Sequence, residues 1–252
     1  YQWRNPDKKS YTEEVEGVKF EWVWTLPYKG NGLKRFLNMI SYFFTAFYRG
    51  LKSKEKPDVI VGSSVHLFAC LAAYFLSKIK KSNYIVEIRD LWPKTLIDFG
   101  AIGKYHPAAL IFGAIEKFVY RKAKKIIVTL PGAVDYISSL GIDKNKIYYI
   151  PNGIDFERMR KESTKSSLSD ELNNLKKNYN YILMYVGAHG MANSLDTIID
   201  SSNFLRRDDV AYVFIGSGPE KERLKSKAGE NFYFFDSIPK NEVQDTLKKA
   251  DV

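Results

Sequence analysis

The feature that most constrains the fold is a regular alternation of short apolar segments with longer helical ones, which runs from residue 58 almost to the end of the chain. The apolar segments are four to seven residues long and end in small or turn-forming residues. The stretches between them have the three-and-four spacing of buried helices. Such an alternation predicts βαβ units and parallel sheets. Ligands of such sheets bind beyond the carboxyl ends of the strands, so we expect the functional residues to follow the strands.

The alternation falls into two series separated by a polar segment. Residues 158–180 are rich in Ser, Lys and Asn and have little apolar periodicity, which is typical of a linker or a surface excursion. Two series predict two doubly wound α/β domains that face a cleft, at residues 1–155 and 156–252. The first series predicts strands at 58–62, 84–88, 125–130 and 146–150 with helices at 66–80, 107–122 and 132–140; the second predicts strands at 181–187, 210–215 and 232–235 with helices at 194–204, 221–227 and 241–250, the last capped by Asn241.

Residues 1–57 are less regular but contain two interpretable segments. Apolar and polar residues alternate from Val18 to Thr25, which predicts a half-buried strand. A helix is expected from Leu33 to Leu51, because its apolar residues recur at three-and-four spacing. Its large aromatic face is flanked by Lys and Arg, so it fits either an ordinary core-facing helix or one that lies in the headgroup layer of an anionic membrane.

The composition excludes several classes of protein. The chain has 252 residues and a formal net charge of +10. Residues 1–150 hold 24 Lys and Arg against 13 Asp and Glu, whereas residues 151–252 hold 15 against 16, so the excess charge lies in the first half. A single cysteine, Cys70, rules out a disulfide-stapled fold. Three histidines without ligand spacing predict no metal site.

The two ends of the sequence suggest a piece of a longer protein. The chain opens with Tyr1-Gln2-Trp3, which has no features of a signal peptide. It closes on Ala250-Asp251-Val252, where a further strand is expected to begin. The longest apolar run, 67–76, has ten residues, and a membrane-spanning helix needs about 20.

Five short strings occur in the order found in one family of enzymes. The strongest is Pro151-Asn152-Gly153-Ile154-Asp155, which by itself predicts only a tight turn between the two series. Together the strings resemble family 4 glycosyltransferases, and in particular the WbuB-like branch of bacterial surface-polysaccharide synthesis. The other four are Arg89-Asp90-Leu91-Trp92-Pro93, Tyr185-Val186-Gly187-Ala188-His189-Gly190, Gly216-Ser217-Gly218-Pro219-Glu220 and Lys249-Ala250-Asp251-Val252, while residues 28–39 fit more loosely.

The resemblance implies a GT-B fold, in which two Rossmann-like domains bind the two substrates. Residues 1–155 would form the acceptor-side domain and residues 156–252 an incomplete domain for a nucleotide-sugar. The family's glycine-rich first strand would precede Tyr1, and its acidic pair for the donor would follow Val252. The resemblance also implies a retaining reaction that needs neither a bound metal nor another cofactor.

The donor site is expected at the glycine turns of the second series. Backbone N–H groups and the following helix suit a diphosphate at residues 187–190, although the glycines there also fit a plain strand-to-helix turn. Gly216-Ser217-Gly218 resembles the family's second glycine turn and likewise fits a structural turn. The Arg and Lys that many relatives carry near the first turn are missing, which leaves neutralisation of the diphosphate to backbone N–H groups, to His189 or to residues after Val252. The predicted donor-binding residues are Gly187, Ala188, His189, Gly190, Gly216, Ser217, Gly218 and Ile238.

The acceptor side is expected where the strands of the first series end. By resemblance, His66 is the catalytic-loop histidine, which would orient the acceptor hydroxyl or stabilise the leaving phosphate; it also fits a helix-start histidine satisfied by its neighbours. Arg89 and Asp90 are predicted to be catalytic, with a mutual surface ion pair as the alternative. The remaining predicted cleft residues are Ser63, Ser64, Thr129, Asn152 and Gly153.

The sequence therefore predicts a cytoplasmic glycosyltransferase. It would transfer a sugar from a nucleotide-diphosphate sugar, with UDP as the expected nucleotide, to a lipid-linked or saccharide acceptor. Its basic first half fits peripheral attachment to the anionic inner face of the plasma membrane. A nucleotide-sugar epimerase of similar build is the alternative. A nucleic-acid-binding protein is a remote one, because the aromatic residues follow buried rather than exposed periodicity.

Overall fold

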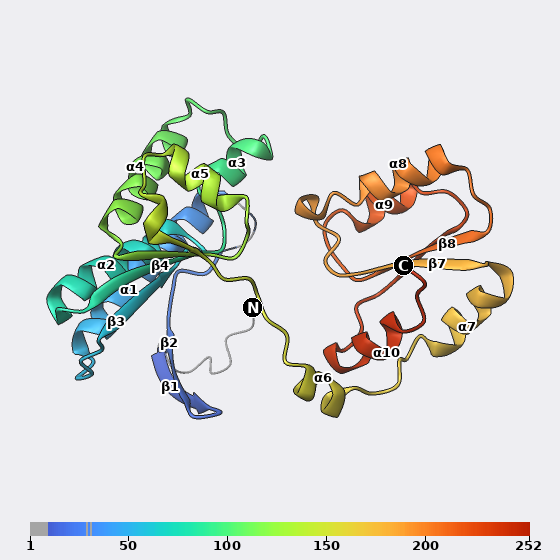
Figure 1. The fold of residues 1–252 in the computed structure, drawn as a ribbon, viewed down its shortest axis with the longest axis horizontal. Helices are drawn as coiled ribbons and strands as arrows, with labels where there is room; N and C mark the ends of the chain where they lie inside the picture. The colour runs from blue at the N-terminus through green and yellow to red at the C-terminus, as the bar shows by residue number, and fades with distance from the viewer. Residues whose placement is uncertain (1–9, 29, 31) are drawn as a thin grey trace. The chain divides into compact units, whose positions relative to one another are not determined.

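The computed structural model describes residues 10–28, 30 and 32–252, which fold into two compact units that divide between Asn152 and Gly153 (Figure 1). The division falls just before the predicted boundary at residue 155, within the turn that the sequence places between the two series. Lys29, Asn31 and the opening tripeptide lie outside the described residues.

The first unit contains a four-stranded parallel sheet in the order β3-β4-β5-β6. Parallel pairing requires crossover connections, and helices make them, so the predicted βαβ units are confirmed. The strands are β3 (Val59–Ser63), β4 (Asn83–Ile88), β5 (Lys125–Val128) and β6 (Ile147–Tyr149), and the helices of the unit are α1 (Leu33–Lys52), α2 (Leu67–Lys80), α3 (Lys94–Asp98), α4 (Pro107–Lys122) and α5 (Ala133–Ser139), with a 3-10 turn at Lys144–Lys146.

The core of this unit lies between the sheet and its helices. Alternate residues of β4 and β5, among them Val86 and Ile126, are completely buried and point toward the helices. Each such side chain contributes roughly 1.5–3 kcal/mol through burial. The rings of Phe36, Phe68 and Phe112 meet edge to face at 5.7–6.2 Å between centroids, which joins α1, α2 and α4 in one layer.

A two-stranded hairpin precedes this sheet. Its second strand, β2 (Val18–Val23), was predicted, whereas the first, β1 (Ser10–Val15), was not. Glu16 and Gly17 make the turn with positive φ, and polar residues fill much of β1, so no apolar alternation marks it. The half-buried face predicted for β2 is wrong for Val18 and Phe20, whose side chains are exposed.

The second unit is a three-stranded parallel sheet with helices on both faces (Figure 1). All six residues of the central strand are buried, as expected for a strand covered on two sides. The backbone of Asp251 and Val252 forms hydrogen bonds with Ile182 and Met184, along the free edge of the sheet. The strands are β7 (Tyr181–Val186), β8 (Val210–Ile215) and β9 (Phe232–Phe235), and the helices are α6 (Phe156–Glu162), α7 (Ser169–Asn178), α8 (Asp196–Leu205), α9 (Lys221–Lys227) and α10 (Val243–Leu247), with 3-10 turns at Met191–Asn193 and Lys240–Glu242.

The prediction of a linker at 158–180 is wrong. Helices α6 and α7 occupy most of this segment, and Leu172 of α7 is completely buried against the sheet. The segment is also held by α10, because the Ser166 N–H donates to the Asp245 carboxylate at 2.9 Å. Helix α10 is shorter than predicted and is not capped by Asn241, whose side-chain amide donates to Thr164 instead.

One carboxyl group is buried in the first unit. Glu116 of α4 is 1% exposed and accepts a hydrogen bond from the Tyr136 hydroxyl at 3.0 Å, while its other oxygen has no partner among the described residues. Burial raises the pKa of Glu116 to about 7. The folded chain therefore holds this proton up to a higher pH than the unfolded chain does.

Between pH 4.5 and about 7 the folded state keeps the proton of Glu116 while the unfolded state releases it. The first unit therefore loses stability as the pH rises through this range. Gln at position 116 keeps an acceptor for Tyr136 and removes the titration. We expect Glu116→Gln to be more stable than the wild type at pH 8, by up to about 3 kcal/mol, with the difference shrinking toward pH 5. Denaturant unfolding of both proteins at the two pH values measures this, and an equal difference at both would contradict it.

Candidate functional site

A pocket of about 240 Å³ lies where the three strands of the second unit end. Its walls come from the carboxyl ends of β7 and β8 and from the residues that follow β9, at the edge where parallel sheets bind ligands. Of the eight residues predicted to bind the donor, Gly187, Ala188, Gly216, Ser217 and Ile238 line this pocket. Val186, Ile215 and Ser237 complete the lining.

Two glycine turns interlock to form the floor of the pocket. A Cβ atom on Gly216 would overlap the carbonyl oxygen of Gly187, and one on Gly218 would overlap that of His189. Gly216 also has a φ of 151°, in the region that L side chains rarely adopt. The His189 N–H donates to the Ser217 carbonyl at 2.9 Å, which ties one turn to the other. The close approach of the two turns therefore shapes the pocket.

Three backbone N–H groups of the glycine turns are free; Ala188 and Ser217 line the pocket, whereas Gly218 follows Ser217 and lies outside the lining. Among the described residues, the N–H groups of Ala188, Ser217 and Gly218 have no hydrogen-bond partner. The hydroxyl groups of Ser217 and Ser237 lie 3.0 Å apart in the same place. Free N–H groups beside small residues suit the oxygen atoms of a phosphate.

The side chain of His189 does not line the pocket, although the sequence predicts it to bind the donor. Its side chain is completely buried between Tyr185, Phe214 and Phe234, and neither ring nitrogen has a hydrogen-bond partner among the described residues. Burial, and then the nearby Lys221, lower the pKa of His189, which keeps the ring neutral. The expectation that its imidazole neutralises a diphosphate is therefore wrong, and its backbone supports the glycine turns instead.

Lys221 is a residue of this site that the sequence analysis missed. Its Nζ donates to the carbonyl oxygens of Gly216 at 3.0 Å and Phe235 at 2.8 Å, and it pairs with Asp236 at 2.6 Å. The lysine is 8% exposed and so holds together the ends of β8 and β9 beside the pocket. The sequence did contain an indication of this role. A lysine at the first position of a helix interacts unfavourably with the helix dipole, so its presence there suggests that it has another partner.

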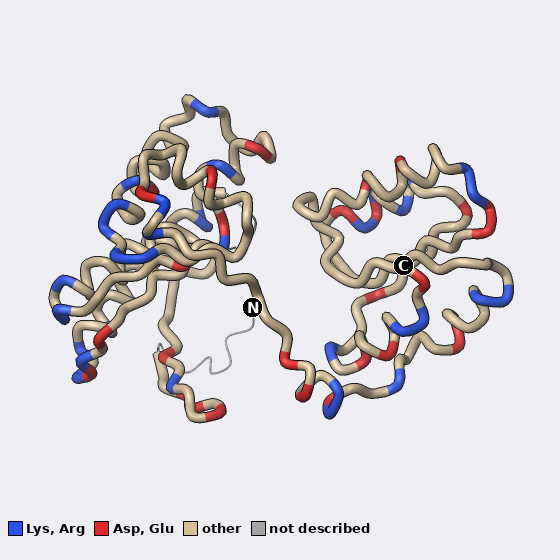
Figure 2. Tube along the Cα trace, in the orientation of Figure 1, with Lys and Arg blue, Asp and Glu red and all other residues tan. Residues whose placement is uncertain are grey.

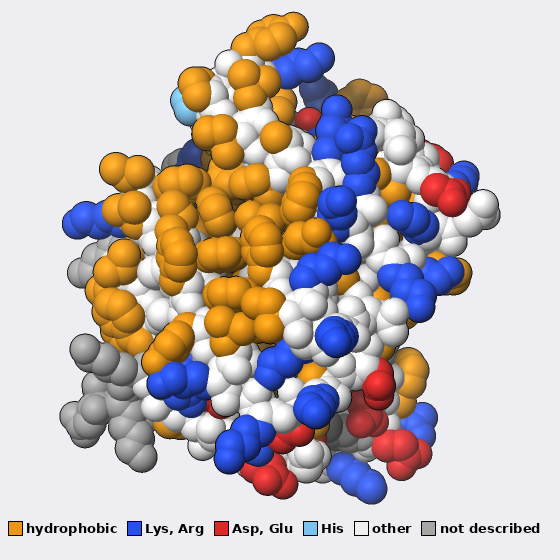
Figure 3. Space-filling model, turned by 90° about the vertical axis from the view of Figure 1, so that its left-hand side faces the viewer, with side chains coloured by type: hydrophobic (Ala, Val, Ile, Leu, Met, Phe, Trp, Pro, Cys, Tyr) orange, Lys and Arg blue, Asp and Glu red, His pale blue; other side chains and the backbone are white. Residues whose placement is uncertain are grey.

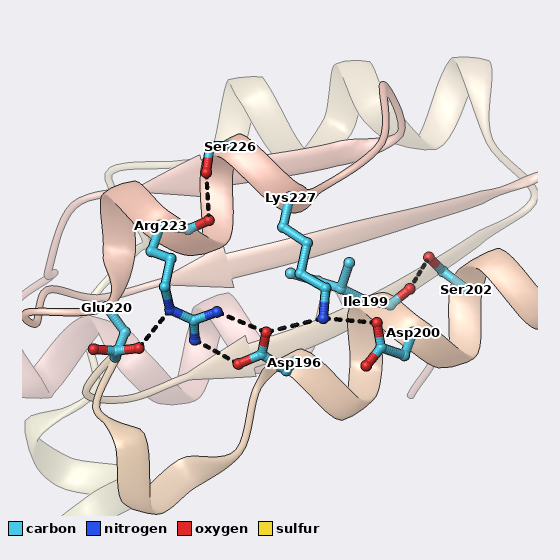
Figure 4. Close-up of polar contacts among 8 residues, drawn as sticks. All are labelled: Asp196, Ile199, Asp200, Ser202, Glu220, Arg223, Ser226 and Lys227. Atoms are coloured by element: carbon cyan, nitrogen blue, oxygen red, sulfur yellow. Dashed lines mark hydrogen bonds and ion pairs between the residues drawn. The ribbon is translucent and has the colours of Figure 1, made fainter.

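An ionic network joins the two helices that follow the glycine turns (Figure 4). Arg223 of α9 grips both carboxylate oxygens of Asp196 at the start of α8, at 2.9 and 2.5 Å, and also pairs with Glu220. Lys227 bridges Asp196 and Asp200 at 3.0 and 2.7 Å. These hydrogen bonds hold the pKa of Asp196 well below its usual range. The network is largely exposed, so it orients the helices more than it stabilises them.

A larger hollow, of about 640 Å³, lies at the opposite edge of the same sheet. Its lining is polar and includes Arg206, Arg207 and Glu230, which sit where the strands begin. Ligands of doubly wound sheets bind at the carboxyl edge, so the smaller pocket is the better candidate for the site.

At the carboxyl edge of the first sheet, His66 caps α2. Its Nδ1 accepts a hydrogen bond from the Ala69 N–H at 3.3 Å, and its ring meets that of Tyr42 at 5.2 Å between centroids. Burial, and then the charge of Arg35, lower the pKa of His66 to about 4. The ring is thus neutral at pH 7, and with Nδ1 acting as acceptor its proton is assigned to Nε2.

Ser64 joins the segment after β3 to the segment after β4 at the predicted acceptor side. It is completely buried, and its hydroxyl accepts from the Arg89 N–H and donates to the Asp90 carbonyl, both at 3.1 Å. The side chains of Arg89 and Asp90 are exposed and form no ion pair with each other or with other described residues, so the ion-pair alternative is wrong. Their charges are available to a ligand.

The other predicted cleft residues differ in their surroundings. The Ser63 hydroxyl is buried at the end of β3 without a partner among the described residues. Thr129 donates weakly to the Ile88 carbonyl at 3.4 Å, at the same edge of the sheet. Asn152 and Gly153 are exposed at the division between the units. Gly190 forms part of the first glycine turn without lining the pocket.

The described residues hold no group of three or more His, Cys, Asp or Glu side chains arranged to bind a metal ion. His106, for which the sequence analysis gave no functional role, accepts from the Ala108 N–H as the cap of α4.

Comparison with known proteins gives a family and a fold. The family model described as a glycosyl transferase 4-like domain matches residues 3–153. Over 247 residues the chain is 23% identical to WcaI of Escherichia coli K12, a protein named for glycosyl transfer in colanic acid biosynthesis. That match covers 94% of this chain and 60% of the relative.

Two solved structures have the same arrangement of elements. Sucrose-phosphate synthase from Thermosynechococcus elongatus matches with a TM-score of 0.71 at 13% identity, over 98% of this chain and 61% of that one. HepE from Anabaena in complex with UDP-glucose matches with a TM-score of 0.57 at 13% identity, over 88% of this chain and 57% of that one. The likeness shows the fold, which is the predicted pair of Rossmann-like units of the GT-B type. The chain spans about 60% of the length of these proteins.

The interlocked turns give a test of how the pocket is built. We expect Gly216→Ala to lower the free energy of unfolding of the second unit by at least about 2 kcal/mol, because Cβ meets the Gly187 carbonyl at a strained φ. Gly229→Ala is the matched control, since the nearest atom to its Cβ is a side-chain oxygen at 3.5 Å. Denaturant unfolding compares the two variants, and equal stability would show that the turns can separate without cost.

Proposed function

Because the chain belongs to the glycosyl transferase 4-like family, we propose that the protein transfers a sugar from a nucleotide-diphosphate sugar to an acceptor hydroxyl in polysaccharide synthesis. The observation that carries this proposal is the pocket of the second unit at the ends of parallel strands, with free N–H groups on Ala188 and Ser217 in its lining and on Gly218 next to Ser217. The assignment is to the whole protein, because this chain spans about 60% of the length of its relatives.

The second unit is the proposed donor side. The N–H groups of the two glycine turns would bind the diphosphate, and Ile238 would lie against the base or sugar. The identity of the donor is supported by the fold shared with HepE, whose structure holds UDP-glucose, so a UDP-sugar is the proposed donor. With His189 buried, backbone dipoles carry the stabilisation of the diphosphate within the described residues.

The first unit is the proposed acceptor side. The acceptor oxygen would form a bond to the anomeric carbon while the bond from that carbon to the β-phosphate oxygen breaks, and the acceptor proton would pass to the leaving phosphate. A neutral His66 with its proton on Nε2 fits a hydrogen-bond donor to the reacting oxygens. Asp90 would orient the acceptor hydroxyl, and Arg89 would stabilise negative charge on the leaving group.

The finer points of the proposal follow from the family resemblance. The reaction would retain the anomeric configuration and would use no metal ion. The acceptor would be lipid-linked or a growing saccharide. The enzyme would work in the cytoplasm, at the inner face of the plasma membrane, where the basic first unit would meet anionic lipid.

Binding of nucleotide-sugars by the full-length protein tests the function. We expect calorimetry to detect a UDP-sugar with micromolar to millimolar affinity and to detect free nucleosides more weakly, because the diphosphate supplies the contacts to the turns. Incubation with donor and a lipid-linked acceptor should then release UDP and glycosylated lipid. No binding of any nucleotide-sugar would overturn the proposal. Conversion of the donor to an epimer without acceptor would assign the site to an isomerase.

Substitutions of His66 give a sharper test, because they can separate its role as the cap of α2 from its proposed role in the reaction. We expect His66→Asn to keep the thermal stability, since Asn is a good helix cap, and to lose at least about a hundred-fold in kcat. His66→Ala should lose the same activity and about 1 kcal/mol of stability as well. A His66→Asn enzyme with wild-type turnover would show that the histidine is only a cap.

The pH profile of the wild type adds a second readout. Because the pKa of His66 lies at about 4, protonation of this ring should leave activity unchanged between pH 6 and 8. An NMR titration of the ring should give a midpoint well below that of a free histidine. A midpoint near 6.5 would contradict the lowered pKa and with it a ring that stays neutral throughout this pH range.

A further inference from the structure

Three neighbouring helices of the first unit expose apolar side chains on their outer faces. Helix α2 lies between α1 and α4, and the buried sides of all three pack toward the sheet. Their exposed sides carry large hydrophobic residues at helical spacing, which Figure 3 shows as a broad apolar field. We call this surface the three-helix face; its members are Leu37, Phe44, Tyr48 and Leu51 of α1, Phe75 and Ile79 of α2, and Leu110, Ile111 and Phe118 of α4.

The three-helix face is continuous across the seams between the helices. The Phe75 ring of α2 meets those of Phe43 and Phe47 of α1 at 6.2 and 6.5 Å between centroids. On the other side of α2, Tyr74 meets Phe118 of α4 at 5.1 Å. The exposed apolar side chains therefore form one surface and not three separate stripes. Contiguous apolar surfaces of this kind mark sites of interaction.

A row of lysines borders the face. Each helix ends with an aromatic residue followed four residues later by a lysine whose Nζ lies over that ring, at 4.5 Å for Lys52, 5.7 Å for Lys78 and 5.9 Å for Lys122. None of these three lysines takes part in an ion pair with the described residues. Figure 3 shows Lys and Arg side chains running beside the apolar field, and Figure 2 shows the blue segments of the first unit.

The charge on these helices has one sign. Together α1, α2 and α4 contain nine Lys or Arg and a single acidic residue, Glu116, which is buried. Burial also raises the pKa of Glu116, so it offsets little of the surface charge. A partner that covers this face must accept both apolar side chains and a positive border.

An anionic bilayer meets both requirements better than other partners do. A second copy of the chain would bring the same excess of Lys and Arg to the interface and no exposed acidic residue on these helices to pair with them, and like charges repel. A nucleic acid would pair with the lysines but would leave the apolar residues without a partner. Lipid headgroups pair with Lys and Arg, while the region below them takes Leu, Ile, Phe and Tyr side chains. No helix in the described residues is long and apolar enough to cross the bilayer, so the contact would be interfacial.

We propose that the three-helix face is a membrane-docking surface that lies in the headgroup layer of an anionic bilayer. This inference rests on the proposed function in one respect, since a lipid-linked acceptor places the reaction at a membrane. It goes beyond the single amphipathic helix expected from the sequence, because α2 and α4 supply most of the surface next to α1. Leu37 and Leu110 near the helix starts bring the face toward the carboxyl edge of the sheet, where His66 lies.

Sedimentation of the full chain with vesicles tests the proposal. The probes are vesicles of phosphatidylcholine alone and of phosphatidylcholine with an equal amount of phosphatidylglycerol. We expect strong binding to the anionic vesicles only. Replacing Lys52, Lys78 and Lys122 with Gln should weaken that binding about a hundred-fold, at about five-fold for each lysine. The matched control replaces Lys176 and Lys177 of the second unit and should bind like the wild type.

A second set of variants tests the apolar part of the face. Phe44→Gln, Ile79→Gln and Ile111→Gln together should reduce binding to anionic vesicles at least about ten-fold. Phe204→Gln, at a residue of the second unit that is 88% exposed, is the control. Wild-type affinity of either triple variant for anionic vesicles would overturn the proposal. So would a concentration-dependent dimer in solution that the apolar triple variant dissociates, because that result assigns the face to a second copy.

The experiment separates the docking surface from the proposed chemistry. The triple variants leave the pocket of the second unit untouched, so nucleotide-sugar binding by calorimetry should match that of the wild type, and circular dichroism should show an unchanged fold. Loss of nucleotide-sugar binding in every protein, with vesicle binding intact, would refute the proposed function and leave the docking surface standing. Loss of selective vesicle binding in the wild type would refute the docking surface alone.

Discussion

The close approach of two backbone turns is the constraint on which the second unit depends. The turn after β7 and the turn after β8 pass so near each other that side chains at Gly216 and Gly218 would overlap carbonyl oxygens of the other turn. The remaining elements maintain this approach: Lys221 holds the ends of β8 and β9, and the network around Arg223 joins the helices that follow the turns. This arrangement leaves N–H groups free on Ala188 and Ser217 in the lining of the pocket, so the packing of the turns and the proposed chemistry have the same cause.

Much of the fold could be predicted because parallel sheets impose strong patterns on a sequence. Strand β8 and helices α4 and α9 lie where periodicity placed them, since buried strands require apolar runs and crossover helices require apolar stripes. Helix α7 was missed because its burial depends on only a few leucines and on hydrogen bonds between Ser166 and distant residues of α10. Strand β1 was missed because a hairpin strand with polar residues on both faces has no alternation to detect.

The site shows the same division between local and tertiary information. Glycine turns after strands are visible in a sequence, and Gly187 and Gly216 do line the pocket. The positions of the side chains around the turns cannot be predicted from the sequence, because they depend on how the loops pack against one another in the folded sheet. His189 is buried against Phe214, and the Ser64 hydroxyl forms hydrogen bonds with the backbone of Arg89 and Asp90. Lys221 was overlooked for the same reason, since its three acceptors come from segments that only the folded sheet brings together.

The proposed donor site is tested most directly by the backbone amide signals of the pocket during a titration with UDP. We expect the amide resonances of Ala188, Ser217 and Gly218 to shift first and furthest, because their N–H groups gain phosphate acceptors. Those of Arg206 and Glu230, at the opposite edge of the sheet, should stay in place. Shifts that gather at the opposite edge, or no saturable shift at the three amides, would contradict the claim that the glycine turns bind a nucleotide diphosphate.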